Sequence, residues 1–349
     1  MKRYLILEDG TVFEGKAFGA DKTAVGELVF TTGMCGYIET LTDESYFGQI
    51  VLQTFPLIGN YGIIEEDFEG DCSVKAYAVQ EACDNPSNFR MQKTLDAFLK
   101  EKGIPGICGI DTRAVTKRIR EKGVMNAAVA DEIPDSLDFI KNYKIVKAVE
   151  SVTVKEPRVY NENGKYSVVL IDYGAKRNII RELVKRDCRV TLVPASASAE
   201  EILSLKPDGI MLSNGPGDPA ENVYEINEIK KLAGAVPTFG ICLGHQLLAL
   251  SLGARTEKLK YGHRGVNQPV KETDGKRTYI TSQNHGYAVV SDSIKSGKVS
   301  FINANDGTCE GIDYPEINAF SVQFHPEACS GPRDTAFLFD RFIGLMEEK

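Results

Sequence analysis

Gly240-Ile241-Cys242-Leu243-Gly244 is the stretch of this sequence that decides its fold. The apolar residues before it, Val236–Phe239, suit a buried strand, and those after it, His245–Leu250, suit a helix. A sharp turn between strand and helix needs flanking residues without bulk, and the two glycines meet that need. The pattern matches the G-x-S-x-G turn that exposes a nucleophilic serine, with cysteine in its place. A buried structural cysteine explains the pentapeptide equally well, so the rest of the sequence must decide.

The sequence around this pentapeptide alternates between strand and helix patterns. Such alternation is typical of a mostly parallel sheet with helices on both faces. In that architecture ligands bind at the carboxyl ends of the strands, where the turn at Cys242 would lie. A final helix is expected near 334–347. The expected strands are 168–171, 190–193, 209–212 and 236–239, and the expected helices between them are 177–186, 199–205 and 225–232.

The N-terminal part of the chain has a different character. Tyr4–Leu7 and Thr11–Phe13 flank an Asp9-Gly10 turn, which predicts a hairpin. Helices are expected near 91–100 and from Asp111, an N-cap residue, to Gly123. Residues 151–165 are polar and irregular. We therefore predict an α/β protein with a smaller strand-rich mixed domain at 1–150, a linker at 151–165, and a helix-flanked parallel sheet at 166–349.

Composition excludes several classes of protein. The 349 residues are 42% hydrophobic and carry a net charge of −8, which argues against a nucleic-acid partner. The eight cysteines form no C-x-x-C pair, so no metal site is expected. No signal peptide and no apolar run of about 20 residues is visible, which favours a reducing cytoplasm and no membrane partner.

Two glycine-rich segments resemble phosphate-binding loops. Gly10–Ala17 has alanine where a magnesium-binding hydroxyl is needed, and its context is a hairpin. Gly215–Ala220 contains two prolines, and no acidic residue ends the next strand. We therefore expect no nucleotide cofactor in this chain. The second loop fits better at the top of a strand, with its backbone N–H groups turned toward Cys242.

A cysteine nucleophile that cleaves an acyl bond needs a base, a carboxylate to orient that base, and donors for the oxyanion. The chain has histidines at 245, 263, 285 and 325. His245 lies inside the predicted helix, where we expect it to be packed, and neither His263 nor His285 has an adjacent carboxylate. His325 follows a predicted strand, and Glu327 is two residues further on. Cys242, His325 and Glu327 are thus the candidate catalytic residues.

Three motifs taken together resemble triad-type, class I glutamine amidotransferases: Asn214–Pro219, Gly240–Gln246 and His325-Pro326-Glu327. The resemblance implies that Cys242 attacks the side-chain amide of glutamine. It implies that His325 is the general base and acid, and that Glu327 orients it. The backbone amides of Gly215 and Leu243 would form the oxyanion hole.

The N-terminal half and the start of the second domain resemble small subunits of carbamoyl-phosphate synthetase, over essentially the full chain. The resemblance rests on Leu7–Thr11, Leu41–Tyr46, Ile110–Arg113 and Asp172–Asn178. Arg264 departs from that family, in which a second histidine is common at this position. By the same resemblance, the residues expected to bind glutamine, beside Gly215 and Leu243, are Ser45, Gly217, Gln246, Asn284, Gly286 and Tyr287.

This resemblance implies a glutaminase subunit that hydrolyses L-glutamine through a Cys242 thioester. The released ammonia would pass to a large partner subunit, in a heterodimer, that makes carbamoyl phosphate from bicarbonate. ATP and magnesium are expected on that partner, and no cofactor on this chain. The sequence leaves the arginine and pyrimidine pathways undistinguished. The alternatives are an amidotransferase subunit of another pathway, a cysteine peptidase, and a catalytically silent regulatory subunit.

Overall fold

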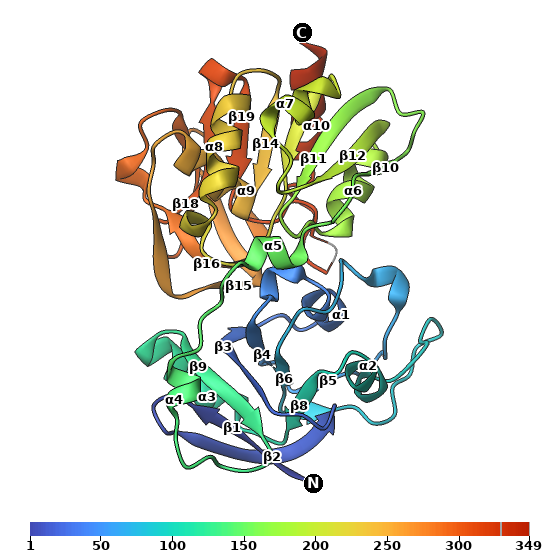
Figure 1. Cartoon of the computed structure of the whole chain (residues 1–349), viewed down its shortest axis with the longest axis vertical. Coiled ribbons are helices and arrows are strands. Elements are labelled where there is room, and N and C mark those ends of the chain that lie inside the picture. Colours follow the sequence, from blue (N-terminus) through green and yellow to red (C-terminus); the bar gives the residue numbers. More distant parts are fainter. Residues whose placement is uncertain (329, 349) are drawn as a thin grey trace. The chain divides into compact units, whose positions relative to one another are not determined.

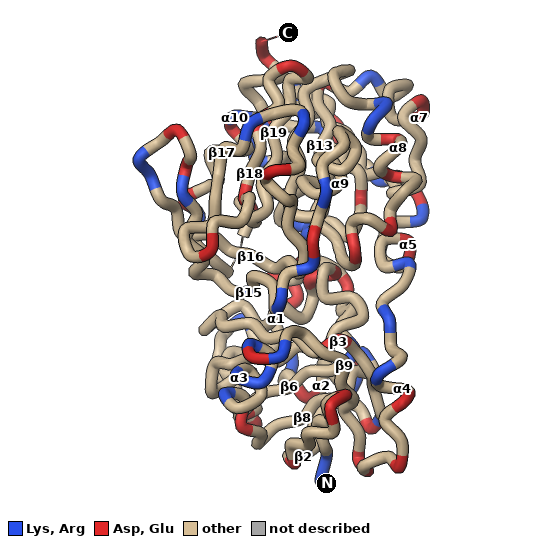
Figure 2. The backbone as a smooth tube through the Cα atoms, turned by 90° about the vertical axis from the view of Figure 1, so that its left-hand side faces the viewer, with Lys and Arg blue, Asp and Glu red and all other residues tan. Residues whose placement is uncertain are grey.

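The structure is a computed structural model that describes residues 1–328 and 330–348. The chain divides into two compact units, Met1–Val146 and Lys147–Lys349. Residues 151–165, suggested as a linker by their polar sequence, contain the end of one helix and a strand of the second unit. Lys and Arg are interspersed with Asp and Glu along both units (Figure 2).

The first unit is built around a closed barrel of seven strands within residues 2–130, in the order β1-β2-β8-β6-β4-β3-β9. The predicted hairpin is confirmed, since β1 pairs antiparallel with β2, and this pairing agrees with the rejection of a phosphate loop at Gly10–Ala17. The barrel strands are β1 (Lys2–Leu7), β2 (Val12–Gly19), β3 (Ala24–Thr31), β4 (Gln49–Gln53), β6 (Ala76–Ala78), β8 (Pro105–Cys108) and β9 (Met125–Ala130).

Short helices and a two-stranded sheet complete this unit (Figure 1). The predicted cap of α3 is confirmed, because the Asp111 side chain accepts a hydrogen bond from Ala114 N and the helix ends at Gly123. The elements are α1 (Tyr37–Leu41), α2 (Leu95–Glu101), α3 (Thr112–Lys122), α4 (Asp138–Lys141), the 3-10 turns η1 (Glu44–Tyr46) and η2 (Glu65–Asp67), and strands β5 (Leu57–Ile58) and β7 (Glu81–Ala82).

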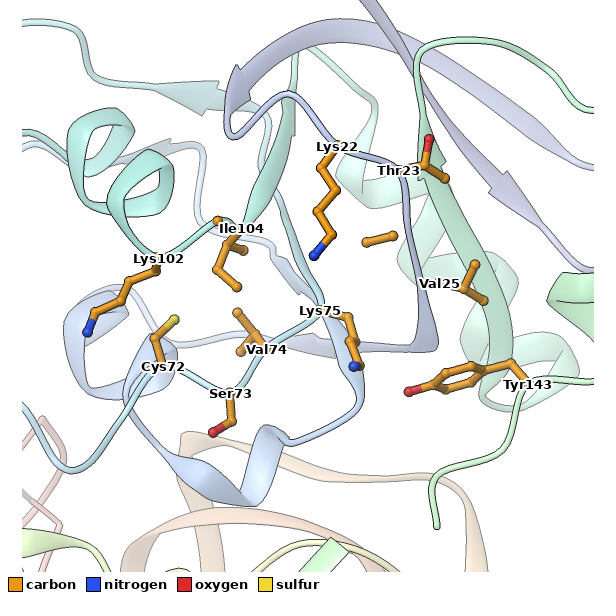
Figure 3. A pocket seen from close by; sticks show the side chains of 12 residues that line it. Lys22, Thr23, Val25, Cys72, Ser73, Val74, Lys75, Lys102, Ile104 and Tyr143 are labelled. Carbon is orange, nitrogen blue, oxygen red and sulfur yellow. The ribbon is translucent and has the colours of Figure 1, made fainter. Parts of the chain in front are cut away.

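A cavity of about 390 Å³ opens where β3, β6 and β8 begin (Figure 3). Lys22, Lys75 and Lys102 contribute to its lining, beside Cys72 and Tyr143. Burial raises the pKa of Cys72 to about 12, so this thiol stays neutral at physiological pH. None of the candidate catalytic or glutamine-binding residues lines the cavity.

The second unit contains a sheet of ten strands in the described residues, ordered β10-β12-β11-β13-β14-β19-β18-β17-β15-β16. Its centre, β12-β11-β13-β14-β19, is parallel, as predicted, and the remaining strands pair antiparallel. The strands are β10 (Arg158–Tyr160), β11 (Tyr166–Asp172), β12 (Cys188–Pro194), β13 (Gly209–Leu212), β14 (Thr238–Ile241), β15 (Thr256–Glu272), β16 (Thr278–Val289), β17 (Lys298–Asn303), β18 (Cys309–Tyr314) and β19 (Ala319–Val322).

Helices cover both faces of the parallel centre (Figure 1). Alternate residues of β11 point to opposite faces: Val169 packs in the cluster with α7, α8 and α9, and Val168 in the cluster with α6 and α10. The helices are α5 (Ala148–Val152), α6 (Arg177–Val184), α7 (Ala199–Ser204), α8 (Val223–Leu232), α9 (Leu243–Ser251) and α10 (Phe337–Glu347), with 3-10 turns η3 (Pro219–Glu221), η4 (Ser291–Ser293) and η5 (Pro315–Ile317).

Two further observations bear on the sequence expectations. Among the described residues, no helix combines the length and the apolar character that crossing a bilayer requires. The seven cysteines that the structure describes are all free thiols, and Cys329 lies outside the described residues.

Candidate active site

Cys242 occupies a sharp turn between β14 and α9. Its backbone has φ 52° and ψ −102°, a strained conformation for a residue with a side chain, and only 3% of it is exposed. The turn is held from both sides, because Cys242 N donates to Val322 O at 2.9 Å and Cys242 O accepts from Gln246 N at 3.2 Å. The expected sharp turn between strand and helix is confirmed.

Both flanking glycines are needed for this turn. A Cβ on Gly240 would lie 2.8 Å from the carbonyl oxygen of Gly244, and a Cβ on Gly244 would lie 2.4 Å from that of Leu212. Backbone atoms cannot move aside to make room for a Cβ in the way that the end of a flexible side chain can. The close approach of α9 to β13 and β14 therefore depends on residues without side chains.

We predict that Gly244→Ala destabilises the second unit by about 1–3 kcal/mol, because the added methyl group forces α9 away from β13. The matched control is Gly344→Ala in α10, where an added Cβ would meet nothing within 4 Å. That variant should gain up to about 1 kcal/mol from helix propensity. Urea unfolding of both variants and the wild type measures the difference. Equal stability of the two variants would contradict the crowding at Gly244.

His325 and Glu327 form a buried pair close to Cys242. His325 Nδ1 lies 2.6 Å from Glu327 Oε1, and neither side chain is exposed. The side-chain amide of Asn178 on α6 donates to the backbone oxygen of Glu327, which fixes the carboxylate's position. His325 Nε2 is buried and makes no hydrogen bond of ordinary geometry within the described residues. This nitrogen is therefore available for proton exchange with Cys242.

Burial lowers the pKa of His325, as does Lys176, but Glu327 and the nearby Cys242 outweigh both and raise it to about 9. Burial raises the pKa of Glu327, but His325 and Lys176 bring it below its ordinary value. Glu327 is therefore ionised at neutral pH and favours a protonated imidazole. An imidazolium beside a sulfur stabilises the thiolate, which is the nucleophilic form of cysteine.

Lys176 is a site residue that the sequence reasoning did not assign. Its Nζ lies 3.3 Å from His325 Nδ1 and 3.7 Å from Glu327 Oε1. Lys176 directly precedes α6, after the carboxyl end of β11, so the strand-end rule that located Cys242 and His325 also applies to it. Its neighbours in sequence, Ala175 and Arg177, form no recognisable catalytic motif with it. The sequence pattern therefore did not identify Lys176 as a site residue.

Gly215 and Leu243, whose amides are expected in the oxyanion hole, belong to two segments in contact. A Cβ on Gly215 would be 2.8 Å from Leu243 Cδ2, so the loop after β13 contacts the start of α9. Neither Gly215 N nor Leu243 N donates a hydrogen bond within the described residues. Their assignment to the oxyanion hole stays a prediction, because such a hole needs two N–H groups directed at one oxygen.

Hydrogen bonds link several of the expected glutamine-binding residues of the second unit to the turn at Cys242. The Cys242 thiol donates to the backbone oxygen of Asn284 at 3.7 Å. Gln246 Nε2 donates to Tyr287 O and to Gln323 Oε1, both at 2.8 Å. Gly286 lies between Asn284 and Tyr287 on β16. The structure thus brings β16 against the elbow.

The other two expected residues occupy different surroundings. Gly217 follows β13, in the loop that carries Gly215, and has φ 90°. Ser45 lies in η1 of the first unit, where its backbone N donates to Asp43 Oδ1 at 2.9 Å. Its assignment to glutamine binding stays a prediction.

The remaining histidines differ from His325 in their surroundings. His245 is packed in α9, as predicted, with Nδ1 2.8 Å from Ser321 Oγ, and burial lowers its pKa to about 3. It therefore stays neutral. His263 and His285 are stacked edge to face, with ring centroids 4.9 Å apart, in a polar cluster beside β16.

Comparisons with known proteins agree with this geometry. Residues 169–345 match the family "Glutamine amidotransferase class-I", and residues 5–129 match "Carbamoyl-phosphate synthase small chain, CPSase domain". A carbamoyl phosphate synthase small chain from Oceanobacillus iheyensis is 52% identical over 353 residues, which cover 99% of this chain and 96% of that protein. One from Listeria monocytogenes serotype 4b is 51% identical over 355 residues, covering 100% of this chain and 98% of the relative.

Among solved structures, a glutamine amidotransferase from Thermotoga maritima is 20% identical. It matches 52% of this chain and 84% of its own length with a TM-score of 0.39. This chain is about 50% identical to both small chains over nearly its whole length, and both of its domains match family models. Together these matches place the sequence in one family. This chain belongs to the carbamoyl phosphate synthase small chains, with a class-I glutamine amidotransferase domain as its second part.

Proposed function

We propose that this chain is the glutaminase subunit of a carbamoyl-phosphate synthetase, with Cys242, His325 and Glu327 as its catalytic residues. The observation that carries the proposal is the buried His325–Glu327 pair beside the strained Cys242 turn. Cys242 gives its thiol proton to His325, and the sulfur bonds to the side-chain amide carbon of L-glutamine. His325 gives a proton to the departing nitrogen, so that the C–N bond breaks and ammonia leaves a glutamyl thioester.

The second half of the reaction returns the enzyme to its starting state. His325 takes a proton from water, the water oxygen bonds to the thioester carbon, and the C–S bond breaks. Glutamate leaves and the sulfur regains its proton. The amides of Gly215 and Leu243 stabilise the oxyanion in both halves, and donors of this kind contribute about 3–4 kcal/mol each in other acyl-transfer enzymes.

The glutamine-binding residues in this proposal are those named from the sequence. Asn284 contacts the sulfur and Gln246 contacts Tyr287, which supports the assignment of Gln246, Asn284, Gly286 and Tyr287, and Gly217 lies in the loop that carries Gly215. Ser45 of the first unit belongs to the set by the sequence resemblance alone. The amide of Gln246 is already committed to two acceptors, so its Oε1 is the atom best suited to the ligand's donors.

The released ammonia requires an acceptor outside this chain, because ammonia that enters bulk water is protonated and loses its nucleophilicity. We propose that the acceptor is a large partner subunit, which combines ammonia with bicarbonate and binds the required ATP and magnesium. The name of the two relatives, carbamoyl phosphate synthase small chain, supports such a partner. The match of residues 5–129 favours this pathway over other amidotransferases. The free thiols suit the cytoplasm as the location.

Co-expression with the large chain of the same organism tests this function. We expect the two chains to co-purify and to make carbamoyl phosphate from glutamine, bicarbonate and ATP. Glutamate should form in equal amount. A chain that releases glutamate but forms no complex and no carbamoyl phosphate would contradict the assigned partner while leaving the glutaminase chemistry intact.

A further inference from the structure

Glu310 on β18 is a fully buried carboxylate outside the triad, with 0% of its surface exposed. Its Oε1 accepts from Asn303 Nδ2 at 3.2 Å and lies 3.4 Å from His263 Nδ1, and its Oε2 accepts from Gln283 Nε2 at 2.9 Å. Burying a carboxylate is costly unless partners compensate for the lost water. These partners come from β17, β15 and β16, so the carboxylate ties three other strands to β18.

Most polar atoms around this carboxylate face a hydrogen-bond partner. His263 Nε2 lies 2.8 Å from Asp306 Oδ2, and His285 faces Tyr287 O with Nδ1 and Gln283 Oε1 with Nε2. Burial holds the pKa of His285 well below its ordinary value, so the neutral ring donates to only one of these two oxygens. His263, His285 and Glu310 are close enough together to hold a metal ion. Because both nitrogens of His263 face carboxylates and both oxygens of Glu310 accept from protein donors, we interpret the cluster as a hydrogen-bond network.

Strand β16, which this network holds, is weakly supported by its sheet. It is the last strand in the sheet order and pairs with β15, with one further antiparallel bridge from Ser282 to His325. That pairing is interrupted between Lys258 and His263 and again between Gly265 and Gln268. Bulges and edge positions leave a strand with fewer ladder hydrogen bonds. The position of β16 therefore depends on side-chain contacts more than that of a central strand does.

The same strand carries the contacts of the glutamine site. Gln283 directly precedes Asn284, whose backbone oxygen accepts from the Cys242 thiol. Gln283 also contacts His285, which contacts Tyr287 O, the acceptor of Gln246 Nε2. A second route runs through the backbone, because Gln323 N donates to Glu310 O at 2.9 Å and Gln323 Oε1 accepts from Gln246. Both routes lead from Glu310 to Gln246.

We propose that Glu310 is a positioning residue, whose buried carboxylate holds Gln283 and thereby fixes the segment Gln283–Tyr287 against Cys242. The inference rests on the proposed function, which assigns this segment to glutamine. Glu310 does not touch the reacting atoms. Its loss should loosen glutamine binding and leave the triad assembled.

Steady-state kinetics of Glu310→Ala in the complex with the large chain tests the inference. We expect the KM for glutamine to rise about tenfold or more, with kcat within about threefold of the wild type. Synthesis from added ammonia should be unchanged, because ammonia does not use this site. Glu310→Gln keeps an oxygen for Asn303 and His263 but places an amide nitrogen opposite Gln283 Nε2, which is also a donor. It should therefore raise the KM as Glu310→Ala does, although the volume of the side chain is kept.

The matched control is Glu228→Ala on α8. Glu228 is also buried, at 7% exposure, and its carboxylate accepts from Ala199 N, remote from β16. This variant should lower stability and leave the KM for glutamine unchanged. If both alanine variants raise the KM alike, the effect is one of general destabilisation and the positioning role is wrong.

A wild-type KM in a folded Glu310→Ala complex would also overturn the inference. Should that variant not fold, Gln283→Met removes the contacts to both Glu310 and His285 with little change in volume. A raised KM in Gln283→Met supports the link and a wild-type KM contradicts it. A wrong proposed function would give a different result, because glutamine-dependent activity would then survive in Cys242→Ser.

Discussion

Replacing Cys242 by serine is expected to abolish glutamine-dependent synthesis of carbamoyl phosphate, with a loss of at least about 1,000-fold. Serine keeps the size of the side chain and fits the same strained turn, but its hydroxyl is a far weaker nucleophile than a cysteine sulfur that has passed its proton to an imidazole. Synthesis from added ammonia should continue at nearly the wild-type rate. Both rates are measured on the purified complex at saturating ATP and bicarbonate.

Cys188→Ser is the matched control for this prediction. Cys188 on β12 is also a buried free thiol of the second unit, and burial raises its pKa to about 12, so it cannot act as a thiolate at neutral pH. This variant should retain glutamine-dependent synthesis. Wild-type glutamine turnover in Cys242→Ser would show that the nucleophile has been assigned to the wrong residue.

The part of the site that lies in short sequence motifs could be predicted from the sequence. The pentapeptide around Cys242 contains both glycines that the turn needs, and His325 and Glu327 are only two residues apart. Their meeting at one place depends on the sheet order, in which β13, β14 and β19 are neighbours. Alternation of strands and helices indicates a parallel sheet but does not give the order of its strands.

The contacts that the sequence did not reveal join residues far apart in the chain. Lys176 and His325 are separated by 149 positions. Glu310 meets Gln283 across two intervening strands of the sheet order, β17 and β15. Closure of the first unit's barrel likewise depends on the pairing of β1 with β9, near residue 130. A local pattern predicts a strand and its buried face, but such distant pairings depend on the packing of the whole unit.

His325→Asn is expected to reduce glutamine turnover by at least about 1,000-fold, because asparagine can neither take nor return a proton at the position of Nε2. The matched control is His245→Asn. His245 is equally buried and stays neutral, with its pKa lowered to about 3, and its hydrogen bond to Ser321 is structural. We expect this variant to lose stability and to retain turnover. The measurement is glutamate release by each purified complex.

The rate of glutamine turnover in the double variant Cys242→Ser/His325→Asn shows whether the two residues act together or contribute independently. If sulfur and imidazole act as one ion pair, removing the second partner costs little once the first is absent, so the double variant should be no more than about tenfold slower than Cys242→Ser. Two independent losses would multiply instead, to about a millionfold. Multiplication would contradict the pairing that the raised pKa of His325 beside Cys242 indicates. Non-additive loss, with ammonia-dependent synthesis intact, would support a shared proton between the two residues.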